Sequence, residues 1–139
     1  MKKNKITLLI ILVAACLIAG ITYMEWHKSL SLKIDPNDVE GITVLASNGA
    51  KSINVSKISD YVRIVEDLES VSFYKTHRVA GKFKSQYGLT IYKLGGGYSY
   101  HIYIISSDTV VFNGWEYEAR SGSIDVDFIK SLYDEYTAY

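Results

Sequence analysis

Hydrophobic and polar positions divide the chain into one unbroken apolar run and a longer region in which the two alternate. The apolar run, ITLLIILVAACLIAGITYM, extends over 19 residues from Ile6 to Met24 without a charge. A helix of this length measures about 29 Å, close to the ~30 Å hydrocarbon core of a bilayer. We therefore predict a transmembrane helix over residues 6–24, within a cytoplasmic stub and anchor of residues 1–26.

The flanks of this run predict its orientation. Three lysines precede it, and cytoplasmic flanks carry the excess of cations, so we expect a single-pass protein with its N-terminus inside and its C-terminal domain outside the cytoplasmic membrane. Two alternatives stay open. The tetrad VAAC ending at Cys16 resembles a bacterial lipobox, in which Cys16 is lipidated and becomes the new N-terminus. Ordinary signal-peptide cleavage would release the rest of the chain.

Two later segments have the period of a one-sided helix. Residues 27–40, with the turn cluster DPND, are expected to form a spacer before a domain of residues 41–139. A helix is predicted over residues 57–69 with Ser56 as its N-cap, and another over residues 125–136 with Asp125 as its N-cap. Their buried positions are expected to be Ile58, Tyr61, Val62, Val65 and Leu68 in the first, and Phe128, Ile129, Leu132, Tyr133 and Tyr136 in the second.

Between and before these helices the period is two, which is typical of strands with one buried face. Turn signals such as Asn48-Gly49, the glycines at 95–97 and Asn113-Gly114 separate the strands and favour hairpins. The predicted order is ββαβββββα, an α+β domain with a mainly antiparallel sheet and two helices on one face. The strands are expected at residues 42–46, 53–55, 71–73, 87–91, 98–104, 109–112 and 115–119.

Composition excludes several classes of protein. Lys and Arg number 15, Asp and Glu number 15, and the resulting zero net charge argues against a nucleic-acid binder. One Cys excludes a disulfide framework and a Cys-rich zinc site. His27, His77 and His101 are far apart, and we expect no metal and no cofactor.

Charge is distributed unevenly along this neutral chain. Residues 70–107 contain no acid and carry a charge of +5, whereas residues 108–139 carry −5. One interpretation is mutual neutralisation by pairing in space. The other is a basic loop that binds an anionic partner such as lipid headgroups, wall phosphate polymers or an acidic protein. Its candidate binding residues are Lys75, His77, Arg78, Lys82 and Lys84.

Tyrosine is the second unusual feature, at 12 of 139 residues. Six of them lie in the predicted meander from 87 to 119, together with Trp115. Packing within the sheet would account for many of these side chains. Exposed Tyr next to Lys and Arg is also the composition of a recognition surface. Tyr98, Tyr100 and Trp115 are therefore further candidate binding residues.

Residue patterns typical of catalysis are absent. There is no GxSxG, and the carboxylates Glu116 and Glu118 fall on one face of a strand, as expected for a solvated face. We therefore expect a non-enzymatic protein, with a small cell-envelope hydrolase or a structural envelope component as the alternatives.

The basic start, the apolar anchor, the Asn-Gly hairpin, the meander and the terminal helix DVDFIKSLY at 125–133 resemble small uncharacterised exported proteins of Gram-positive bacteria. The resemblance implies a protein of the bacterial cell envelope and no particular catalytic residues. The function expected is a membrane-tethered binding or interaction module that acts outside the cytoplasm. Its partners would be membrane lipid through the anchor, and a protein or anionic envelope component. The oligomeric state is left open.

Overall fold

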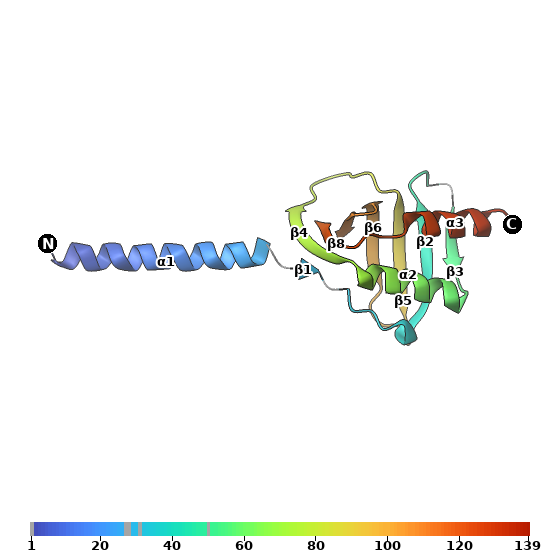
Figure 1. Cartoon of the computed structure of the whole chain (residues 1–139), viewed down its shortest axis with the longest axis horizontal. Coiled ribbons are helices and arrows are strands. Elements are labelled where there is room, and N and C mark those ends of the chain that lie inside the picture. The colour runs from blue at the N-terminus through green and yellow to red at the C-terminus, as the bar shows by residue number, and fades with distance from the viewer. Residues whose placement is uncertain (1, 27–28, 31, 50) are drawn as a thin grey trace.

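The computed structural model of the chain describes residues 2–26, 29–30, 32–49 and 51–139. A long N-terminal helix is followed by strands, and two further helices accompany the sheet (Figure 1). In chain order the elements are α1 (Lys2–Trp26), β1 (Ser29–Leu30), the 3-10 turn η1 (Pro36–Asp38), β2 (Val39–Ala46), β3 (Ser52–Val55), α2 (Ile58–Ser70), β4 (Ser72–Arg78), β5 (Tyr87–Lys93), β6 (Tyr100–Ser106), β7 (Thr109–Phe112), β8 (Trp115–Ser121) and α3 (Val126–Thr137).

α1 stands apart from the rest of the fold in Figure 1. Its segment Asn4–Met24 is long and apolar enough to cross a membrane, and none of that segment is buried inside the structure. Exposing this many apolar side chains to water is unfavourable. An apolar environment, such as a bilayer or a signal-sequence receptor, would remove that cost. Cys16 lies within this helix, which continues to Trp26.

The strands form one antiparallel sheet in the order β1-β4-β8-β7-β6-β5-β2-β3. Hairpins join β2 to β3 and link β5, β6, β7 and β8 in succession, as expected for strands separated by short turns. At the turn between β7 and β8, Asn113 and Gly114 both have positive φ, of 51° and 78°. The predicted α+β class, with its antiparallel sheet, is confirmed.

The hydrophobic core lies between one face of the sheet and the layer formed by α2 and α3 (Figure 1). Both helices place their apolar stripes on it, because Tyr61, Ile64, Val65 and Leu68 of α2 and Ile129, Leu132 and Tyr133 of α3 are buried. Inward-facing strand residues complete the core; among them are Ile42, Val44, Ile53, Val55, Phe73, Leu89, Ile91, Ile102, Ile104 and Val110.

The segment expected to be a spacer belongs in large part to the folded domain. β1 pairs with β4 through Ser29–Tyr74 and Leu30–Phe73, and Leu32 and Ile34 are buried in the core. The backbone N–H of Ile34 donates to the Glu69 carboxylate at 2.9 Å. The folded domain therefore includes residues well before position 41. Residues 27, 28 and 31 of the predicted spacer lie outside the described residues.

The helix predictions need two corrections. Lys57, not Ser56, is the N-cap residue of α2, and it makes no side-chain capping hydrogen bond. Ile58 is 66% exposed, so the buried stripe begins at Tyr61, one turn later than predicted. The stripe also includes Ile64, which is 1% exposed and was not among the predicted positions. For α3 the predicted cap is confirmed, because the Asp125 side chain accepts a hydrogen bond from the Phe128 backbone N–H at 3.0 Å.

Several strand boundaries also differ from the prediction, and two of these differences change where candidate residues lie. β4 continues to Arg78, because β8 offers a seven-residue partner whose Trp115 pairs with Arg78. Lys75, His77 and Arg78 therefore belong to a strand and not to a loop. β6 begins at Tyr100, which leaves Tyr98 outside the strand and 94% exposed.

Candidate functional site

One face of the sheet is covered by α2 and α3, and the opposite face, which we call the open face, has no helix over it (Figure 1). Side chains on a strand alternate between faces, so the neighbours of buried residues lie on the open face. Tyr103 stands between the buried Ile102 and Ile104, and its cross-strand partners are Val111 and Gly88. Val111 is 3% exposed, which indicates a small packed cluster on the open face.

The loop between β4 and β5 (residues 79–86) folds over this cluster. The Phe83 ring meets the Tyr103 ring edge-on, with centroids 5.1 Å apart and planes at 79°. Gly88 leaves room for that arrangement, because a Cβ there would lie 3.5 Å from the Tyr103 ring. That distance is ordinary van der Waals contact, so Gly88 packs directly beneath the Tyr103 ring.

Backbone hydrogen bonds hold both ends of the same loop. The Val79 N–H donates to the Gly114 carbonyl at 2.9 Å, and the Gln86 N–H donates to the Ile104 carbonyl at 2.7 Å. With Phe83 packed in the middle, the loop is fixed at three points. Its position relative to the sheet is therefore defined by the fold.

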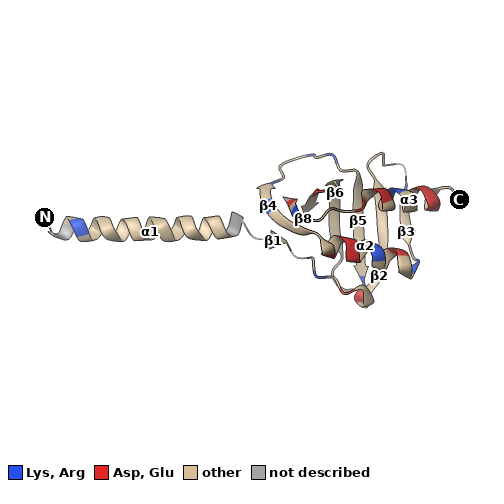
Figure 2. Ribbon diagram, viewed as in Figure 1, with Lys and Arg blue, Asp and Glu red and all other residues tan. Residues whose placement is uncertain are grey.

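Three cations, which we call the loop cations, lie at or in this loop: Arg78 at the end of β4, and Lys82 and Lys84 within the loop. All three are exposed. Among the described residues, none of them lies within 4.0 Å of a carboxylate oxygen. Figure 2 shows basic residues along this loop, whereas acidic residues gather on α2, α3 and η1.

Close ion pairs connect the basic and acidic segments at a single point among the described residues. Their ion pairs join Arg63 to Asp125, His77 to Glu116, and Lys130 to Asp134. Only the His77 contact links the acid-free segment 70–107 to the acidic segment 108–139. β4 and β8 nevertheless pair side by side, so Glu116 and Glu118 lie on the strand next to Lys75 and Arg78.

Lys75 has a partner of another kind. Its Nζ lies 3.7 Å from the centroid of the half-buried Trp115 ring, a cation–π contact between β4 and β8. The structure therefore brings the candidate residues Lys75 and Trp115 into contact with each other. Both are less exposed than Lys82 and Lys84, and Trp115 pairs with Arg78 across the two strands.

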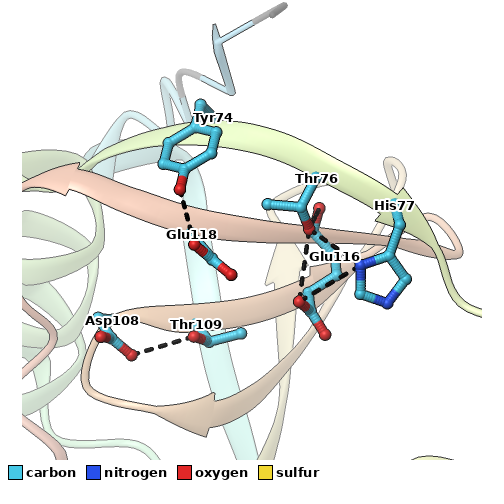
Figure 3. Close-up of polar contacts among 7 residues, drawn as sticks. All are labelled: Tyr74, Thr76, His77, Asp108, Thr109, Glu116 and Glu118. Atoms are coloured by element: carbon cyan, nitrogen blue, oxygen red, sulfur yellow. Dashed lines mark hydrogen bonds and ion pairs between the residues drawn. The ribbon is translucent and has the colours of Figure 1, made fainter. Parts of the chain in front are cut away.

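His77 and Thr76 approach Glu116 from the neighbouring strand (Figure 3). His77 Nδ1 lies 3.6 Å from Glu116 Oε1, and the Thr76 hydroxyl donates to the Glu116 backbone carbonyl at 3.1 Å. The Glu116 side chain is 23% exposed, and the His77 side chain is 61% exposed. This group is a cross-strand contact that stabilises the pairing of β4 with β8.

Glu118 is engaged in the same manner by Tyr74, whose hydroxyl donates to its carboxylate at 2.6 Å (Figure 3). That hydrogen bond favours the neutral phenol and raises the pKa of Tyr74. Asp108 accepts hydrogen bonds from the hydroxyls of Ser106 and Thr109, and these lower the pKa of its carboxyl. The carboxylates of the open face are therefore tied to neighbouring donors.

Tyr98 and Tyr100 lie away from the loop cations. Tyr98 precedes β6 and Tyr100 is its first residue, so both lie near the turn that follows β5. The loop cations lie near the start of β5. Tyr100 is half-buried on the covered face, where its ring centroid is 6.3 Å from that of Phe112. The candidate residues therefore do not form one surface, and the exposed aromatic rings beside the loop cations are Phe83 and Tyr103, neither of which was a candidate from the sequence.

One concavity, shallow and polar with a volume of about 700 Å³, lies between the start of α3 and the β6–β7 turn. Its polar lining includes Gln86, Ser106, Ser107, Ser123, Asp125 and Asp127. Asp125 is occupied by its capping bond and by Arg63, whose guanidinium nitrogen lies 3.1 Å away. Within the described residues, no group of three His, Cys, Asp or Glu side chains is placed to hold a metal ion.

Comparisons with protein-family models, with curated proteins and with solved structures find no match to this chain. The resemblance to exported Gram-positive proteins therefore stays a prediction.

Proposed function

We propose that this protein is a membrane-tethered, non-catalytic binding module whose domain acts outside the cytoplasmic membrane. In this proposal α1 is a single-pass anchor, and the basic residues at its start keep the N-terminus in the cytoplasm. The anchor raises the local concentration of the domain near partners in or on the same membrane.

One observation carries the proposal: exposed cations without carboxylate partners lie next to an uncovered sheet face. Lys82 and Lys84 flank Phe83, and Phe83 packs on the 42%-exposed Tyr103. Exposed aromatic surface next to unpaired cations is the composition of recognition surfaces, and fixing the loop in advance lowers the entropy cost of binding.

The topology can be tested with a reporter enzyme that is active only outside the cytoplasm. We expect a fusion after Tyr139 to be active, and the same fusion to a chain lacking residues 1–26 to be inactive. Activity of a cytosol-specific reporter at the same position would overturn the proposal.

Binding can be tested by photo-crosslinking in cells from single positions in the full chain. We expect the same adduct, identified by mass spectrometry, from Ala80 in the loop and from Leu45 on the open face. A probe at the exposed Glu66 of α2 is the matched control. Equal capture from all three positions would contradict a binding surface on the open face.

The alternative at Cys16 is decided by the intact mass of detergent-extracted protein. An uncleaved anchor gives the mass of the 139-residue chain, or of that chain without its first Met. A chain that begins at acylated Cys16 would replace the single-pass anchor by a lipid anchor and leave the domain on the same side of the membrane.

A further inference from the structure

We propose that the loop cations Arg78, Lys82 and Lys84 lie on the anionic headgroup surface of the same bilayer that holds α1. The inference rests on the proposed function, because it requires α1 to be inserted, and it identifies lipid phosphate as the ligand of the loop. The domain would then be held against the membrane in one orientation.

The connection between anchor and sheet is too short for the domain to move far from the bilayer. α1 ends at Trp26 and β1 begins at Ser29, so two residues separate them. Three Cα–Cα steps of 3.8 Å span at most about 11 Å. The first strand of the sheet therefore lies within about 11 Å of the end of the anchor helix.

The strand pairing then determines which part of the domain is near. β1 is the outermost strand, and its partner is β4 through the pair Ser29–Tyr74. Arg78 lies four residues further along β4, a rise of about 13 Å. Arg78 is the last residue of β4, and Lys82 and Lys84 lie in the loop that follows it. β3 is at the opposite edge of the eight-stranded sheet.

The distribution of charge favours one of the orientations that this connection permits. The loop cations lie at the end of β4 and in the loop after it, and acidic residues lie on η1, α2 and α3 and, closer to the loop, on β8 (Figure 2). An anionic leaflet attracts the first group and repels the second. Each cation near such a surface contributes about fivefold to the attraction, and the effect declines within about 8 Å at physiological salt.

Acidic groups on the open face lie outside contact distance of the loop cations. Glu116 contacts Thr76 and His77, and Glu118 accepts the hydrogen bond from Tyr74. No described carboxylate oxygen lies within 4.0 Å of Arg78, Lys82 or Lys84. Phe83, held against Tyr103, keeps the two lysines that flank it in a fixed segment of the loop.

The test uses the full chain, reconstituted in vesicles and carrying a fluorophore at position 80. Cys16→Ala and Ala80→Cys give a single labelling site, and lipids with a nitroxide on the headgroup act as quenchers. We expect stronger quenching in vesicles with 30% phosphatidylglycerol than in pure phosphatidylcholine. Quenching should fall to the phosphatidylcholine level in 1 M salt, where screening is nearly complete beyond about 3 Å.

The matched variants have the same net charge. Lys82→Gln with Lys84→Gln should lower the ratio of docked to undocked domains about 25-fold, because two contributions of about fivefold are lost. Lys51→Gln with Lys57→Gln, beside β3 at the far edge, should leave the quenching unchanged. Thermal melts check that both variants are folded, and both pairs are exposed, so folding should be preserved.

Each result decides the inference. Equal quenching in both lipid compositions, or equal loss in the two variants, overturns it. Quenching that disappears when a soluble glycerophosphate polymer is added, with crosslinks to that polymer, assigns the loop to a wall-type polyanion instead. If the chain fails to float with the vesicles after an alkaline wash, the proposed function fails. If it floats without lipid-dependent quenching, only this inference fails.

Discussion

The two faces of the sheet differ in what covers them. The covered face buries a continuous core against α2 and α3, whereas the open face buries Val111 beneath Tyr103 and one loop. Charge follows this division only in part, because acids are in excess on the helices while the open face carries both the cations of the loop and the carboxylates of β8. The comparison indicates that the covered face supplies most of the stability and that the open face stays largely uncovered.

The largest effect is expected from truncation on the covered face. Phe73 is 1% exposed, so Phe73→Ala should lower the free energy of unfolding by about 3–5 kcal/mol through lost burial and the resulting cavity. Denaturant unfolding of the full chain in detergent micelles measures the loss. Leu45→Ala on the open face, where Leu45 is 44% exposed, serves as the control and should cost about 1 kcal/mol or less. Similar losses for both would refute the division of roles.

The next effect concerns the cluster on the open face. Tyr103→Ala should lower the free energy of unfolding by about 1–2 kcal/mol, because Val111 loses its cover. A double-mutant cycle with Phe83→Ala should give a coupling of about 0.5–1.5 kcal/mol for the edge-on ring contact. Zero coupling would mean that the loop is not held by Phe83.

A smaller effect is expected where the two helices meet. Asp125 caps α3, pairs with Arg63 of α2, and donates its backbone N–H to Asp67 at 2.8 Å. Asp125→Ala should cost about 1 kcal/mol in unfolding free energy and expose the first-turn amides of α3 to hydrogen exchange. Asp125→Asn keeps a capping oxygen and should recover most of the stability. Equal losses in the two variants would assign the effect to the ion pair.

The smallest effect is a change in the acid dependence of stability. Hydrogen bonds from Ser106 and Thr109 lower the pKa of Asp108, so its contribution is present above the unfolded pKa of about 4 and is lost as the pH falls through the folded value. Asp108→Asn should therefore make the melting temperature fall less steeply below pH 4.

Asp67 provides a control of opposite sign. Burial raises the pKa of its carboxyl, so its stabilising contribution is present at low pH and is lost as the pH rises through the folded value. Asp67→Asn should make the fall at low pH steeper or leave it unchanged. If both variants made the melting temperature fall less steeply at low pH, the assigned pKa directions would be wrong.

The order and type of the elements from β2 to α3 could be predicted because each has a clear period, whereas the two-residue β1 has none and was predicted to be part of a spacer. The alternation around Ile102 and Ile104 and the stripe that includes Leu132 are local patterns, and local patterns determine strands and helices. The end of β4 could not be predicted in this way, since Arg78 is in the strand only because Trp115 of β8 lies beside it.

The candidate surface was only partly predictable for the same reason. Arg78, Lys82 and Lys84 were identified by the missing acids around them, and they are exposed. Tyr98 and Tyr100 are close in sequence to other aromatics but lie next to the turn at the other end of β5 from the loop. The Phe83–Tyr103 contact joins a loop to a strand 20 residues later, and no local pattern marks such a pairing.

The outermost strands have a consequence for crowded copies of this protein. β1 and β3 comprise two and four residues, so each edge of the sheet offers few unpaired backbone groups to a strand from another molecule. Beyond β1, the remaining edge of β4 carries Lys75 and Arg78, and a second copy added there would bring like charges together. The same short edge that connects the domain to its anchor thus opposes fibre-like self-association.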